Sequence, residues 1–176
     1  MKKIMTLLFA SVLMLAGCSL IKDAAEVTIT TDLTTIIPVV VSVTKSVDAQ
    51  EVGASFSQAQ DLKLADNADI EPYLEKIREI NMKSLVVTVN GLTSGQFISS
   101  ISLDVTGVGT ICTQTNITST ANSFTPVIAS GVLEQVGAKL KSDKKITITV
   151  HGDTSGPMAF SVTLVFDTDI VAGALD

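Results

Sequence analysis

Apolar and polar residues alternate along much of the chain with a period of two. This alternation is typical of antiparallel strands that place one face on a core and the other in water. The branched side chains of Thr and Val, which recur in these segments, pack well on a pleated surface. We therefore expect a mainly β protein, an antiparallel β-sandwich whose strands include residues 27–33, 39–44, 97–106, 146–150 and 160–167.

Two segments instead repeat their apolar residues at steps of three and four, which predicts short helices. The first runs from Asp69 to Ile80, with Asp69 as N-cap and Pro72 in the first turn. The second runs from Ser130 to Lys141, with Leu133, Val136 and Leu140 facing inward. We expect both helices to pack over an end or an edge of the sandwich.

An eight-residue segment occurs twice, 61 residues apart, at Thr88–Gly95 and Thr149–Gly156, with six of eight positions identical. Each copy follows a predicted helix and strand and precedes another strand. The second half is therefore a pseudo-repeat of helix, strand, turn and strand. Glycine, threonine and serine are the ordinary residues of a hairpin turn, and this interpretation is purely structural. Alternatively, the paired loops lie together and grip a ligand through Thr93, Ser94, Thr154 and Ser155.

The N-terminus has the layout of a secretory signal peptide, with two lysines before the apolar run Ile4–Ala16. That run is shorter than the roughly 20 apolar residues that span a bilayer. It ends in Leu15-Ala16-Gly17-Cys18, which resembles the lipobox of bacterial lipoproteins at all four positions. The resemblance implies cleavage between Gly17 and Cys18, and a lipid on the Cys18 thiol that anchors the protein to a membrane. The alternative is an ordinary secretory signal with a chance cysteine.

The resemblance divides the chain into a signal peptide, 1–17, a lipidated tether, 18–25, and a single β-sandwich domain, 26–176. Ser19 follows the cysteine, where lipoproteins retained at the inner membrane tend to have Asp, so we expect the outer membrane. The segment Asp69–Ile80 leading into Lys83–Val89 is also similar to uncharacterised β-sandwich lipoproteins of Gram-negative bacteria. That likeness implies no activity.

After cleavage the chain has 10 basic and 18 acidic residues, a net charge of −8, because Lys2 and Lys3 leave with the signal. An acidic surface disfavours nucleic acid and anionic lipid as partners. Cys112 then has no intrachain disulfide partner, and we expect a buried strand thiol rather than a reactive one.

The sequence offers few groups for catalysis. His151 is the one histidine, and Asn90 fills its place in the other repeat, which favours an exposed turn residue over a base or ligand. Neither repeat has the lysine of a phosphate loop or a serine at the centre of a nucleophile elbow. Calcium is a weaker alternative at Asp153 and the segment Asp167–Asp169, because EF-hand spacing is absent. We expect no catalytic residue, no metal and no cofactor.

The sequence therefore predicts a membrane-anchored envelope lipoprotein with a non-catalytic role in binding, adhesion or assembly. Its partner, a protein or a small molecule, is not identified by the residues. A periplasmic carrier that holds a small apolar ligand between its sheets is the first alternative, and an enzyme is the second.

Overall fold

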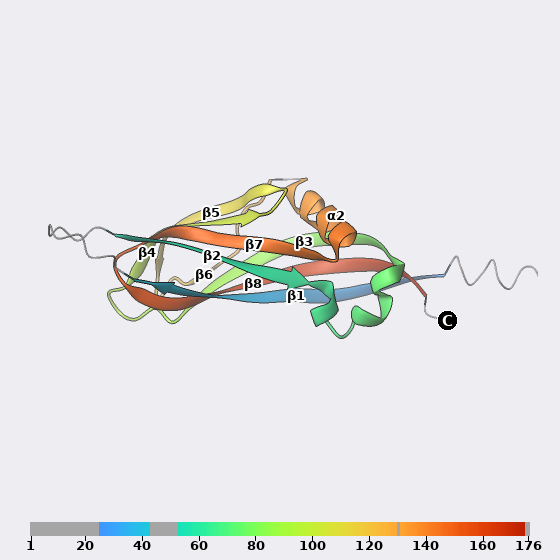
Figure 1. The fold of residues 1–176 in the computed structure, drawn as a ribbon, viewed down its shortest axis with the longest axis horizontal. Helices are drawn as coiled ribbons and strands as arrows, with labels where there is room; N and C mark the ends of the chain where they lie inside the picture. Colours follow the sequence, from blue (N-terminus) through green and yellow to red (C-terminus); the bar gives the residue numbers. More distant parts are fainter. Residues whose placement is uncertain (1–24, 43–52, 130, 175–176) are drawn as a thin grey trace, which may run out of the picture.

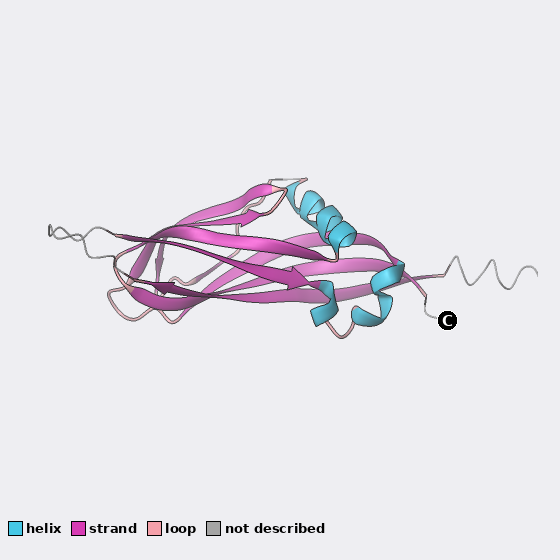
Figure 2. Cartoon of the chain, in the orientation of Figure 1, coloured by secondary structure: helices cyan, strands magenta, loops and turns pink. Residues whose placement is uncertain are grey.

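The computed structural model describes residues 25–42, 53–129 and 131–174. The predicted signal peptide, Gly17, Cys18 and the tether to residue 24 lie outside the described residues. The ribbon consists of two sheets of antiparallel strands with a few short helical segments beside them (Figures 1 and 2). The predicted fold class, a mainly β antiparallel sandwich, is confirmed.

Each sheet has four strands. The first has the order β1-β8-β3-β6, with β1 (Glu26–Val41), β8 (Met158–Gly173), β3 (Ile77–Asn90) and β6 (Ser123–Phe124). The second has the order β2-β7-β4-β5, with β2 (Ala54–Lys63), β7 (Lys145–Thr154), β4 (Phe97–Val105) and β5 (Gly109–Thr118).

The pairing of strands is nested. β1 pairs with β8, β2 with β7, β3 with β6 and β4 with β5, all antiparallel. Two further pairings, β3 with β8 and β4 with β7, join these pairs into sheets. Such nesting results when one long antiparallel hairpin is rolled into two facing sheets, so the fold is an eight-stranded jelly roll.

The core lies between the sheets, where the apolar half of each alternating segment is buried. Phe166 on β8 is fully buried at its centre, and a pair of phenylalanines, Phe56 and Phe160, packs edge to face near one end with ring centroids 5.2 Å apart. Other fully buried side chains are Leu33, Ile37, Leu85, Val87, Ile101, Leu103, Ile148, Val150 and Leu164.

The first predicted helix is largely wrong. The helical part is a short 3-10 segment, η2 (Glu71–Lys76), after a still shorter one, η1 (Leu64–Asp66), and no side chain caps its N-terminus. Ile77 and Ile80 belong to β3 and are buried. A register shift between Ile77 and Glu79 adds an extra residue to β3, so Ile77 and Ile80 face the same side at a spacing of three. The bulge therefore imitates a helical period.

The second predicted helix is confirmed as α2 (Val132–Asp143), which packs mainly on β3. Val136 and Leu140 are buried, as expected, and Leu133 is half-buried. The helix approaches β3 so closely that a side chain at Gly137 would overlap the carbonyl oxygen of Ile80.

The pseudo-repeat matches the order of the elements, because η2 precedes β3 and β4 whereas α2 precedes β7 and β8. These four strands occupy the middle of the two sheets. β3 of one copy pairs with β8 of the other, and β7 pairs with β4. The two copies are thus intertwined, and each copy supplies one central strand to each sheet.

Candidate functional site

Three described connections between the sheets meet at one end of the molecule, which we call the loop end: 91–96 between β3 and β4, 119–122 between β5 and β6, and 155–157 between β7 and β8. The connections through η1 and η2 and through α2 also cross between the sheets, but at the opposite end. β1 ends and β2 begins at this end, because Val41 lies opposite Met158 and Ala54 lies opposite Thr154, and residues 43–52 between these strands are outside the described part. Both Thr-Ser-Gly segments therefore lie at the loop end.

The prediction that these segments form hairpins is wrong. β3 and β4 belong to different sheets, as do β7 and β8, so each segment spans the thickness of the sandwich. Turn-forming residues in sequence look the same whether the next strand pairs with the previous one or faces it across a core. The pairing of β3 with β8 decides the matter, and it joins residues far apart in sequence.

In the first loop, Gly91 and Gly95 have positive φ angles of 99° and 87°. A turn from Thr93 to Gln96, which contains Gly95, is closed by the N–H of Gln96 on the carbonyl of Thr93, and the Gln96 side chain accepts the N–H of Thr93 at 3.0 Å. Thr93 and Ser94 are exposed at the tip.

In the second loop, Thr154 ends β7 and is only 1% exposed. Its hydroxyl lies 3.0 Å from the carbonyl of Ala54 on β2 and 2.8 Å from that of Gly156. Because this hydroxyl is bonded within the protein, it fixes the path of the second loop and is not directed at solvent.

The two loops touch through Phe97 and Ser155. The N–H of Ser155 donates to the carbonyl of Phe97 at 2.9 Å, and the Ser155 hydroxyl accepts the N–H of Phe97 at 3.2 Å. The structure thus brings the second copy's Ser155 against the end of the first loop. The tip residues Thr93 and Ser94 have no bond with the second loop among those described.

An open hollow of about 550 Å³ lies where the loops meet, and Phe97 is 40% exposed beside it. This is the candidate site that the geometry supports, and it contains two of the four residues predicted from sequence, Thr154 and Ser155. Sequence reasoning missed Phe97, because its place in an alternating strand predicted a buried side chain. The lining consists of Gly53, Gly95, Phe97, Ser99, Thr154 and Ser155.

The contrast between the two threonines gives a test of their roles. Thr154→Ala should lower the free energy of unfolding by about 1–3 kcal/mol, because the half-buried carbonyls of Ala54 and Gly156 lose the hydroxyl donor that they share. Thr93→Ala, at an exposed tip, should change it by less than about 0.5 kcal/mol. Urea denaturation measures both, and equal losses would contradict the different roles of the two hydroxyls.

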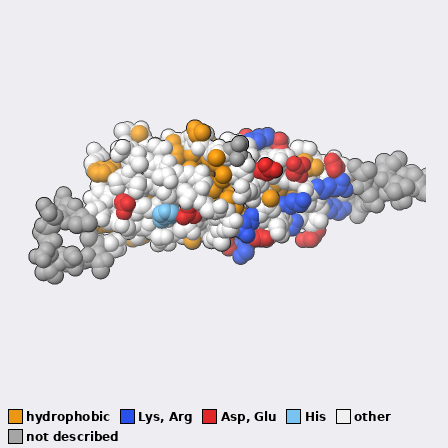
Figure 3. Space-filling model, turned by 90° about the horizontal axis from the view of Figure 1, so that it is seen from above, with side chains coloured by type: hydrophobic (Ala, Val, Ile, Leu, Met, Phe, Trp, Pro, Cys, Tyr) orange, Lys and Arg blue, Asp and Glu red, His pale blue; other side chains and the backbone are white. Residues whose placement is uncertain are grey.

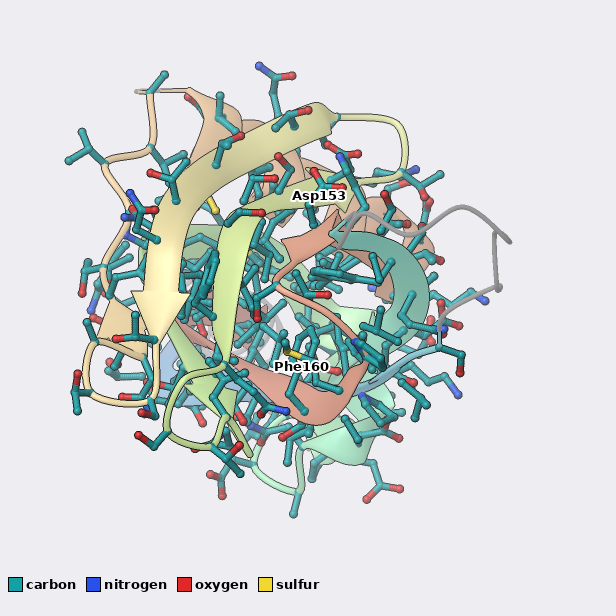
Figure 4. The ribbon with its side chains drawn as sticks, turned by 90° about the vertical axis from the view of Figure 1, so that its left-hand side faces the viewer. Asp153 and Phe160 are labelled. Atoms are coloured by element: carbon teal, nitrogen blue, oxygen red, sulfur yellow. The ribbon has the colours of Figure 1, made fainter. Side chains whose placement is uncertain are left out.

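The loop half of the surface is rich in hydroxyls and poor in charge. Figure 3 shows charged side chains gathered toward the end where β1 begins, with few toward the loop end. No Asp, Glu, Lys or Arg occurs in the stretches 33–41, 84–90, 109–118 and 158–166. Asp153 is a charge near the loop end, and it accepts hydrogen bonds from Ser55 and Ser100 on the outer face of its sheet (Figure 4).

His151 lies within β7 and not in a turn, since the strand continues through Gly152. Its Nδ1 is 3.3 Å from Asp104 on the neighbouring strand, and both side chains are partly exposed. No group of three or more His, Cys, Asp and Glu side chains suited to a metal occurs among the described residues. The candidate calcium ligands do not meet. Asp167 and Asp169 lie beside Lys83 in the half where β1 begins, whereas Asp153 lies near the loop end. The hydrogen bond from Lys83 lowers the pKa of Asp169.

Cys112 lies on β5 and packs half-buried against the core. Burial raises the pKa of its thiol to about 12 from an ordinary value of 9.0. A thiol reacts as its thiolate, so this environment makes Cys112 unreactive near neutral pH. The surroundings therefore favour the structural interpretation of this cysteine.

We expect a maleimide to label Cys112 slowly in the folded protein and rapidly after denaturation. Above pH 9 the unfolded chain releases this proton whereas the folded chain retains it, so stability should fall between pH 9 and 12. The fall should be steeper for the parent than for Cys112→Ala. Rapid labelling at neutral pH, or identical pH profiles for the two proteins, would contradict the burial of the thiol.

Comparison with known proteins assigns no family. No protein-family model matches the chain, and no curated protein matches it. A chain from Desmodium yellow mottle tymovirus is 11% identical, with a TM-score of 0.34, and the match covers 84% of this chain and 91% of that chain. So distant a likeness supports no statement about this protein. No helix within the described residues is long and apolar enough to cross a bilayer.

Proposed function

We propose that this protein is a lipid-anchored envelope protein that binds a partner at its loop end and catalyses no reaction. The observation that carries the proposal is the position of the chain's entry into the fold. β1 begins at Glu26, at the end of the molecule opposite the loop end (Figure 1). Its sixteen residues extend about 50 Å at about 3.3 Å per residue. A lipid on Cys18 would thus hold the loop end about 50 Å beyond the tether.

The surface of the loop half supports this role. Loops on a rigid scaffold are common sites of recognition. The hydroxyls and the exposed ring of Phe97 provide polar and apolar contacts without charge. Such a surface suits an uncharged partner, and its contacts would be insensitive to salt.

The described residues give no observation that favours the carrier alternative. The space between the sheets is filled by buried apolar side chains. The hollow at the loop end and a second one, near Asp66 and Asn67, both open to the surface.

The proposal is tested by one substitution at the loop end and a matched one at the opposite end. Ser94→Arg and Ala68→Arg both place a long cation at an exposed, uncharged position. Each variant is purified from detergent-solubilised envelope after cross-linking, and the envelope components bound to it are quantified by mass spectrometry.

Ser94→Arg should reduce the amount of bound partner at least tenfold, whereas Ala68→Arg should retain it. If purified wild-type protein carries no more envelope component than a mock purification from a strain that lacks the protein, the binding role is contradicted. Equal losses in the two variants contradict binding at the loop end.

A further inference from the structure

β1 is an edge strand, and the direction of its backbone groups can be assigned. Backbone groups of successive strand residues point to opposite sides. The Thr168 hydroxyl on β8 donates to the carbonyl of Thr31 at 2.7 Å, so the odd-numbered residues face β8. The Asn67 side chain reaches the carbonyl of Asp32 from the free side, at 3.4 Å. Pro38 has no N–H, but it is even-numbered, so its nitrogen faces the free side and no hydrogen bond with β8 is lost.

Toward the loop end, the free edge is formed by Thr34, Ile36, Pro38 and Val40. In the described part of the chain, no backbone hydrogen bond reaches these residues from the free side. Their side chains lie on the outer face of the sheet, where Ile36 is 57% and Val40 is 68% exposed. Uncharged, apolar edge strands without bulges are normally kept from solvent, because they pair readily with other strands.

The other three edges of the sandwich are better protected. β6 has only two residues. β5 is interrupted by a register shift and by Asn116, whose φ is +56°. β2 carries Asp61 and Lys63 at one end. β1 pairs with β8 over sixteen residues without a register shift, and Pro38 removes one donor from its free edge.

We propose that the free edge at residues 34–38 pairs antiparallel with the same segment of a second copy, with the two Ile36 residues opposite each other. Two acidic chains repel each other over most of their surfaces, whereas this segment has no charge. In this register Ile36 packs on its counterpart, and Thr34 lies opposite Pro38. The donor that Pro38 lacks then leaves the Thr34 carbonyl of each copy unpaired, at a rim that water can reach.

Antiparallel pairing points the two molecules in opposite directions. Glu26 lies ten residues before Ile36, about 33 Å along the strand, so the two Glu26 residues lie about 66 Å apart at opposite ends. If both copies are anchored as proposed above, the pair joins two facing membranes rather than two neighbours in one membrane. A contact of one strand is weak by itself, but many copies on each surface multiply it.

The pairing is tested in solution without the anchor. Ile36→Cys is introduced into the mature chain that carries Cys18→Ser and Cys112→Ala, so that it is the only thiol. Opposite residues in an antiparallel pair have Cα atoms about 5.5 Å apart, within the reach of a disulfide. Under mild oxidation Ile36→Cys should form disulfide-linked dimers at least tenfold faster than Val86→Cys. Val86 is an exposed position on β3, on the same face of the sheet as Ile36. Equal rates, or no dimer from Ile36→Cys, would overturn the proposal.

The joining of membranes is tested with the full lipidated protein in phosphatidylcholine vesicles. Vesicles that carry wild type should aggregate, at least tenfold faster than with Ile36→Lys. Pro38→Thr restores a donor and should speed aggregation, whereas Val86→Lys should match wild type. If mass spectrometry shows lipid on Cys18 and the vesicles still do not aggregate, the proposal that the pair joins two membranes is overturned. If Cys18 carries no lipid, the proposed lipid anchor is contradicted instead, and the disulfide experiment then tests the strand pairing by itself.

Discussion

Gly152→Ala should lower the free energy of unfolding by up to about 3 kcal/mol, the largest loss expected from adding one methyl group to this protein. Gly152 lies on the central strand β7, and a Cβ there would overlap the carbonyl oxygen of Ser100 and lie 3.0 Å from the Cα of Ile101. Both atoms belong to the backbone of β4, which is held by strands on both sides and cannot move away without breaking hydrogen bonds.

The equivalent glycine of the first copy should behave in the same direction. At Gly91 a Cβ would lie 3.3 Å from the carbonyl oxygen of Ala159, and its φ of +99° adds about 1–2 kcal/mol. Gly156 is the control, because its φ is ordinary and no atom lies within 4 Å of the added Cβ. Denaturant melts should give clear losses for Gly91→Ala and Gly152→Ala and almost none for Gly156→Ala. A Gly152→Ala variant as stable as its parent would contradict the close approach of β7 and β4.

Cys18→Ser should abolish the lipid-mediated attachment of the protein to membranes. Lipid chains contribute about 0.8 kcal/mol for each buried CH₂ group, so their loss removes far more affinity than any contact of the folded domain provides. The resemblance to the lipobox also implies that the signal is no longer cleaved at this position. Cys112→Ser is the matched control, since it removes the chain's other thiol without touching the lipidation site.

Alkaline carbonate extraction of cell envelopes measures the attachment of the mature, cleaved chain. The control, Cys112→Ser, should remain in the membrane pellet, because its lipid anchor is intact. For Cys18→Ser, no cleaved chain that begins at residue 18 should appear. Cleaved, membrane-bound protein from Cys18→Ser would show that another feature provides the attachment.

Much of the fold was predictable from the period-two alternation, and its failures have particular causes. The predicted strand 27–33 and residues 39–41 of the predicted strand 39–44 are parts of one long strand, β1, because Pro38 lies on a free edge where it does not end pairing. Residues 43 and 44 lie outside the described part of the chain. The strand β2 was missed because Gln58 and Gln60 occupy positions of the inner face yet are exposed at this edge. Ile77 and Ile80 imitated a helix because a bulge brought them to one side.

The candidate site was predictable only in part. The repeat correctly indicated two related loops, and their contact through Ser155 was anticipated as the alternative in which the loops lie together. Thr154 is buried and bonds the carbonyl of Ala54 on β2, whereas Thr93 is exposed at the tip of its loop. Identical residues in the two copies thus have different surroundings, and the sequence repeat alone does not predict this difference.

The strand order also lay beyond the sequence. Both loops have the composition of hairpin turns, and the alternation of their flanking strands is compatible with pairing within each copy. The observed pairing is between copies, β3 with β8 and β4 with β7. It depends on which strands best share a core over separations of many residues, and local propensity does not encode that choice.

The most direct test of a lipid-anchored display protein is mass spectrometry of the mature N-terminus. The protein is extracted from envelope with detergent and digested, and its N-terminal peptide is identified with its modification. We predict a peptide that begins at Cys18 and carries a diacylglyceryl group on the thiol. An N-terminal peptide that begins elsewhere, or one that begins at an unmodified Cys18, would contradict the anchor and the function proposed from it.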